Sequence, residues 1–169
     1  PQQDGALNPS LPGHAYYSIS DGRLEQGFGF SPIEHGKARG PGQVVRNEFQ
    51  MYQEPLYART MEISRDQYEK LLEYGTRGTR GDPSLFDLRY NGATNSCVDF
   101  VWKGLEHAGT HRSPSLPLPG KLGYGDPKGY DGELKPTRNI EEFERLQAPL
   151  PDSPHNKTER KPMADDRTL

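Results

Sequence analysis

The sequence contains a single cysteine, Cys97, among its 169 residues. An internal disulfide is therefore excluded, and with it a fold that depends on a disulfide framework. Apolar residues are also scarce, since hydrophobic residues make up 31% of the chain and the mean hydropathy is −0.97. Both values are low for a chain that is buried along its whole length. We therefore expect a compact core with poorly packed flanks.

The composition also lacks the features of two classes of binding protein. Lys and Arg are scattered without a block and the net charge is −3, so the chain has no electrostatic footprint for nucleic acid or for an anionic membrane. No apolar run approaches the roughly 18 residues of a membrane span. We expect no signal peptide at the start of the sequence. We expect neither nucleic-acid binding nor stable membrane insertion.

The hydrophobic pattern predicts an α+β fold in which an antiparallel sheet packs against helices. Strand-like runs within residues 14–30 are separated by Asp21-Gly22, a dipeptide typical of hairpin turns. Two more strand-like runs lie within residues 44–63, on either side of a turn, and are expected to pair. A short strand is expected over residues 85–90.

A first helix is predicted to begin after Ser64. Gln67 lies three residues further on, as in a capping box, and Gly75 is a plausible stop. After Gly109 the composition shifts, because nine of the 16 prolines lie in residues 112–169. Only a segment that begins at Asn139 has the pattern of another, short helix.

This distribution predicts four regions. Residues 1–12 should form an extended N-terminal arm and residues 13–110 the folded core. Residues 111–147 are expected to be a Pro/Gly-rich extension packed on that core. Residues 148–169 contain almost no apolar side chains and are expected to be a linker or mobile tail.

The second helix is the clearest element, and Cys97 begins it. Val98, Val101, Trp102, Leu105 and Ala108 form its apolar face at helical spacing. Asn95 or Ser96 can cap its start and Gly109 can end it. A thiol in a first turn lies where free N–H groups and the helix dipole stabilise a thiolate. Cys97 is therefore a candidate nucleophile, although a lone cysteine is more often a small buried hydrophobic residue.

His14 is the candidate base for this thiol. It begins the first strand and follows Gly13, which permits close approach of backbone or substrate. The other histidines lie in loops, in the tail, or on the Cys97 helix about 15 Å from the thiol. They have no metal-ligand spacing, and a lone cysteine with dispersed histidines argues against a zinc site.

The segments GHAYYSISDGRLEQGFGF and YNGATNSCVDFVWKGLEHAG together resemble the circularly permuted papain-like superfamily. This group includes lecithin:retinol acyltransferase-like proteins, permuted NlpC-like amidases and permuted papain-fold peptidases. In these proteins the strand histidine precedes the cysteine that opens a helix. The resemblance covers residues 13–109 and implies Cys97 as nucleophile, His14 as base and Gln26 as third catalytic residue. Gln26 departs from the His or Glu that is common in the family at this place.

The hairpin turn decides whether Gln26 can serve His14. A strict two-residue turn would direct Gln26 to the opposite face of the sheet and would put Glu25 on the His14 face instead. A three-residue loop that ends at Gly22 would place Gln26 opposite Tyr16, on the same face as His14. We therefore expect the three-residue loop with Gln26, and Glu25 is the alternative.

The resemblance further implies a cysteine peptidase or amidase that needs no metal or organic cofactor. Permuted NlpC-like members cleave peptidoglycan peptides, and the segment PDSPHNKTERKPM is similar to linkers of toxins exported by type VI or type IV secretion systems. The expectation is a secreted antibacterial effector that acts in the target-cell periplasm and has an immunity protein as a possible partner. The alternatives are a lipid acyltransferase or thioesterase, a peptidase or deamidase that acts on a host protein, and a binding module with an inert thiol.

Overall fold

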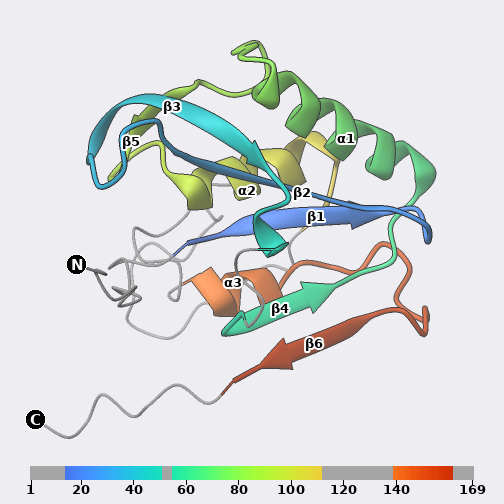
Figure 1. The fold of residues 1–169 in the computed structure, drawn as a ribbon. Helices are drawn as coiled ribbons and strands as arrows, with labels where there is room; N and C mark the ends of the chain where they lie inside the picture. The colour runs from blue at the N-terminus through green and yellow to red at the C-terminus, as the bar shows by residue number, and fades with distance from the viewer. Residues whose placement is uncertain (1–13, 51–54, 112–138, 162–169) are drawn as a thin grey trace, which may run out of the picture.

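The computed structural model describes residues 14–50, 55–111 and 139–161 of the chain (Figure 1). The expected N-terminal arm and residues 112–138 of the expected extension lie outside these ranges. Four strands form an antiparallel sheet in the order β1-β2-β3-β5. They are β1 (Tyr16–Ser20), β2 (Glu25–Pro32), β3 (Arg39–Arg46) and β5 (Arg89–Asn91).

Two helices, α1 (Arg65–Thr79) and α2 (Cys97–His107), pack on this sheet and on each other. The core between them is largely aromatic because Phe28 and Phe30 alternate on β2 and meet Tyr74 and Phe100 from the two helices. Each such side chain contributes about 1.5–3 kcal/mol when fully buried. The chain is thus an α+β protein whose antiparallel sheet packs against helices, as the hydrophobic pattern predicts.

Both helices begin with a capping box. Ser64 accepts a hydrogen bond from the Gln67 N–H, and the Gln67 side chain accepts one from the Ser64 N–H. Ser96 and Asp99 form the same reciprocal pair at the start of α2. Each box satisfies backbone donors that a helix start leaves without helical partners. Helix α2 is therefore anchored at its first turn, where Cys97 lies.

Helix α1 continues past Gly75, so the predicted stop at this residue is wrong. A Cβ atom at Gly75 would lie 2.6 Å from Phe28 Cδ1, and one at Gly78 would lie 2.6 Å from Val44 Cγ2. These glycines allow the helix to approach the sheet closely, which offsets their low helix propensity.

The hairpin between β1 and β2 has a four-residue loop, in place of the two or three residues considered from the sequence. Ser20 pairs with Glu25, so the loop runs from Asp21 to Leu24. Asp21 Oδ1 accepts hydrogen bonds from the N–H groups of Leu24 and Arg23, both at 2.9 Å. These bonds lower the pKa of the Asp21 carboxyl and stabilise the longer loop.

The C-terminal segment is more structured than the composition predicts. Strand β4 (Tyr57–Thr60) pairs with β6 (Lys157–Arg160), whereas residues 44–46 of the strand-like run before it belong to β3, which pairs with β2 and β5. Asn156 Oδ1 also accepts a hydrogen bond of 2.8 Å from the Glu62 N–H. The prediction of a linker or mobile tail over 148–169 is therefore wrong for the described residues 148–161. Backbone pairing with β4 orders a segment that has little apolar surface to bury.

Helix α3 (Ile140–Glu144) packs against a second face of α2, distinct from the face that carries Phe100 and Ala108 into the aromatic core. The rings of Phe143 and Trp102 stack with centroids 4.3 Å apart, and Trp102 Nε1 donates to Asn139 Oδ1 at 3.2 Å. The predicted short helix after Asn139 is therefore present. Because α2 is packed on two of its faces, its first residue is held in a fixed place.

Candidate active site

Cys97 is the first residue of α2 and directly follows the N-cap residue Ser96. It is 6% exposed and packs beside Val98 and Trp102. The Val98 N–H donates to Ser96 Oγ at 3.3 Å, so the N-cap side chain satisfies a backbone donor of the first turn. The positive end of the helix dipole favours a thiolate here.

His14 lies just before β1, with its side chain between Cys97 and Glu48. Its Nε2 atom is hydrogen-bonded to Glu48 Oε2, and the Cys97 side chain lies near enough to the ring to raise the pKa of His14. The side chains of His14 and Glu48 are only 15% and 7% exposed. The structure thus brings together the two residues that the sequence predicts as nucleophile and base.

The electrostatics of this group favour a charged imidazole. Burial by itself lowers the pKa of His14, because it removes the imidazolium from water. Hydrogen bonds to Cys97 and Glu48, together with the negative charges of these two side chains, outweigh burial and raise the pKa to about 10. At neutral pH the His14 ring is therefore protonated.

Glu48 is the carboxylate that the sequence analysis missed. It opens the short 3₁₀ helix η1 (Glu48–Gln50), one residue beyond the end of β3, and is 6% exposed. It lies 34 residues from His14 in the sequence, within a run that has the pattern of a strand. The available signal was weak: Glu48 is the one carboxylate in the strand-like run 44–52, and a carboxylate that a strand buries needs a partner.

The prediction that Gln26 orients His14 is wrong in this geometry. Gln26 pairs with Ile19, whose side chain is in the core, so the two share the face opposite His14. The alternative residue, Glu25, accepts a hydrogen bond of 2.8 Å from Ser18 Oγ at the far end of the hairpin. The four-residue loop shifts the register and removes both residues from the site.

Gly29 provides the space in which the carboxylate meets the imidazole. It lies on β2 opposite Tyr16, on the same face as His14. A Cβ atom at Gly29 would lie 2.8 Å from Glu48 Cδ and 3.1 Å from His14 Nε2. Any other residue would force the Glu48 side chain away from His14.

Replacing Gly29 by alanine should therefore lower the pKa of His14 toward its ordinary value of 6.5, because burial remains while the Glu48 contact is lost. An NMR titration of the His14 ring measures this change. Gly92→Ala is the matched control, since the nearest atom to its added Cβ lies at 3.7 Å, an ordinary contact. An unchanged His14 pKa in Gly29→Ala would show that Glu48 does not control this imidazole.

Tyr90 on β5 is a further polar side chain in the electrostatic surroundings of the thiol. Its ring packs against Phe30 with centroids 5.5 Å apart. Burial, and then the negative charges of Cys97 and Asp99, raise the pKa of its phenol. The hydroxyl therefore stays protonated and keeps its hydrogen for donation.

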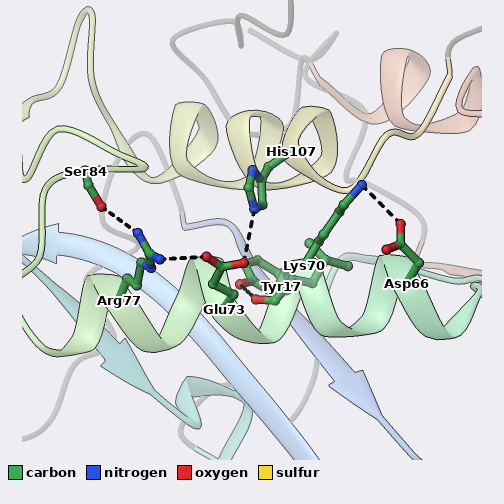
Figure 2. A network of polar contacts seen from close by, with 8 residues as sticks. Tyr17, Asp66, Lys70, Glu73, Arg77, Ser84 and His107 are labelled. Carbon is green, nitrogen blue, oxygen red and sulfur yellow. Dashed lines mark hydrogen bonds and ion pairs between the residues drawn. The ribbon is translucent and has the colours of Figure 1, made fainter.

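His107 belongs to a different polar network, which Figure 2 shows at the contact between α1 and α2. Its Nε2 atom lies 4.0 Å from Glu73 Oε2. Glu73 also forms an ion pair of 2.9 Å with Arg77, which donates to Ser84 Oγ at 3.1 Å. His107 is at the last turn of α2, and Cys97 is at its first, so the two do not meet.

The described ranges contain no group of three or more His, Cys, Asp or Glu side chains arranged to hold a metal ion. Within the same ranges, no helix is long and apolar enough to cross a membrane.

Comparisons of this chain with models of protein families, with curated proteins and with solved structures gave no match.

Proposed function

We propose that this chain is a cysteine hydrolase in which Cys97 is the nucleophile, His14 the proton carrier and Glu48 the residue that orients His14. The observation that carries the proposal is the position of the His14 ring, which is hydrogen-bonded to a buried carboxylate and lies near enough to Cys97 for this side chain to raise its pKa. A nucleophile, a base and an orienting group in contact are the elements of acyl-transfer catalysis.

In the proposed reaction the Cys97 thiolate attacks the carbonyl carbon of an amide and forms a tetrahedral intermediate. Because Val98 and Asp99 donate to the Ser96 side chain, the Cys97 N–H is the first-turn donor left for the oxyanion among the described residues. The intermediate collapses as the C–N bond breaks and His14 gives its proton to the departing amine. The product of this step is a thioester on Cys97.

Water then completes the cycle. His14, now neutral, takes a proton from water as the oxygen attacks the thioester carbonyl. The C–S bond breaks, the carboxylic acid leaves, and the thiolate–imidazolium pair is restored. Glu48 holds Nε2 throughout, so the same nitrogen faces the reacting atoms in both steps. The reaction uses neither a metal nor an organic cofactor.

The fold that we propose is a permuted papain-like, NlpC-like fold. Its support is the order of the elements, because a histidine at the first strand precedes a cysteine that opens a helix packed on an antiparallel sheet. The substrate that follows from the sequence resemblance is an amide bond in peptidoglycan peptides. The biological setting that we propose is a secreted antibacterial effector that acts in the periplasm of a target cell and is neutralised by an immunity protein.

The test of the substrate is incubation of the full chain with purified peptidoglycan, followed by mass spectrometry of the released fragments. New free amino and carboxyl ends within the peptide stems support the proposal. A thioester or lipid-ester substrate in parallel reactions distinguishes the acyltransferase and thioesterase alternative. Cleavage of these esters alone would contradict amide hydrolysis.

The pH dependence of turnover should have an alkaline limb near pH 10. The reason is that the amine can leave only while His14 carries a proton, and the pKa of His14 is raised to about 10. The measurement is kcat/KM as a function of pH, with circular dichroism at each pH to show that the chain remains folded. A decline centred near pH 6.5, the ordinary value for histidine, would contradict the coupling of His14 to Cys97 and Glu48.

A further inference from the structure

Asn47 has an unusual backbone conformation directly before Glu48. Its φ angle is 59°, and within the described ranges it is the one residue other than glycine with a positive φ. This left-handed region is costly for most side chains and is tolerated best by glycine and asparagine. The conformation turns the chain out of β3 and into the 3₁₀ helix that Glu48 opens.

Asn47 is held in this conformation by Gly27 on the neighbouring strand. The Asn47 N–H donates to the Gly27 carbonyl at 2.8 Å, and Asn47 Oδ1 accepts from the Gly27 N–H at 3.1 Å. The side chain thus satisfies the Gly27 donor just beyond the last backbone pair of β2 and β3, Phe28 with Arg46. The Asn47 carbonyl in turn accepts from the Gln50 N–H at 3.1 Å.

These bonds fix the direction in which the backbone continues from Asn47 into Glu48. Gly27 and Gly29 lie on the same face of β2 and present no side chain there, so Glu48 can lie against the strand and reach His14. The backbone of Asn47 determines the direction in which Glu48 leaves β3. We propose that Asn47 is a positioning residue, which sets the Glu48 carboxylate against His14 through its left-handed turn and its paired hydrogen bonds to Gly27.

Only the kinetic consequence of this inference rests on the proposed function. The position of Glu48 can be followed without a substrate, through the pKa of His14. Asn47→Gly permits the same φ angle but removes the Oδ1 acceptor. The pKa of His14 should then fall from about 10 toward 6.5 in an NMR titration. In the hydrolysis assay kcat should fall by about 10- to 100-fold with little change in KM, as expected when a catalytic group is misplaced.

Asn47→Asp is the conservative variant, since it keeps an acceptor at the same place and also tolerates the left-handed region. It should restore kcat relative to Asn47→Gly and keep the His14 pKa at or above the wild-type value. Asn156→Gly is the matched control, because it too removes an asparagine Oδ1 acceptor, here from the Glu62 N–H. It should lower Tm and leave the His14 pKa unchanged.

An unchanged His14 pKa in a folded Asn47→Gly variant would overturn the inference. If that variant does not fold, a lowered His14 pKa in Asn47→Asp would overturn it equally. Failure of the proposed function gives a different pattern. The wild-type chain then has no turnover, while the pKa of His14 still changes when Asn47 is substituted. The two failures are therefore distinguishable.

Discussion

Replacing Cys97 by alanine should abolish hydrolysis, with a loss of at least about 10³-fold in kcat, because no other thiol is present to form the acyl-enzyme. The measurement is the release of product by the purified variant under conditions in which the wild-type chain turns over. Iodoacetamide should add one label to the wild-type chain, slow its turnover, and add none to the variant. Turnover by Cys97→Ala at the wild-type rate would end the assignment of this chain as a cysteine hydrolase.

The variant should remain folded, which allows the loss to be ascribed to chemistry. Cys97 is 6% exposed beside Val98 and Trp102, so removing its sulfur costs about 1 kcal/mol of stability. A matched control is His107→Gln, which changes a residue of the same helix in a network that does not reach the thiol. It should keep the wild-type turnover.

Replacing Glu48 by alanine should lower kcat by about 100-fold or more, because His14 then loses the group that holds Nε2 and stabilises its charge. Glu48→Gln should be less severe, since the amide oxygen can still accept the Nε2 hydrogen but carries no charge. The measurement is kcat and KM for both variants beside the wild type. Gln26→Ala is the control and should have little effect, because Gln26 lies on the opposite face of the sheet.

A loss in Gln26→Ala that equals the loss in Glu48→Ala would contradict the geometry of the site. The pH dependence of stability gives a second readout that does not need a substrate. The folded-state pKa of His14 is raised above its ordinary value of 6.5, so its interactions contribute stability fully below pH 6.5. This contribution is lost as the pH rises through about 10. Glu48→Gln should shift the loss to lower pH, as measured by chemical unfolding across this range.

The sequence by itself determined the local features of the site. The cap candidates Asn95 and Ser96 and the apolar spacing after Cys97 predict a helix that begins at the thiol, and α2 begins there with Ser96 as its N-cap. The strand pattern after His14 predicts β1 in the same way. These features depend on residues that are close in the sequence, where periodicity and capping are reliable guides.

Only the tertiary structure decided which carboxylate reaches His14. The choice between Gln26, Glu25 and Glu48 depends on the length of the hairpin loop and on the turn at Asn47. A shift of one residue in register moves every side chain of a strand to the other face, and the Asp-Gly dipeptide is compatible with several loop lengths. The contact between Glu48 and His14 also requires the bare backbone of Gly29, which lies on a third segment.

The same distinction holds for Gly75 and for the C-terminal segment. Gly75 has the pattern of a helix stop, but α1 continues because the close approach to Phe28 requires a residue without a side chain. Residues Lys157–Arg160 are polar and exposed, so nothing in their composition predicts a strand. They form β6 because β4 offers backbone hydrogen bonds, and the partner that supplies those bonds is about 100 residues away in the sequence, beyond the reach of any local pattern.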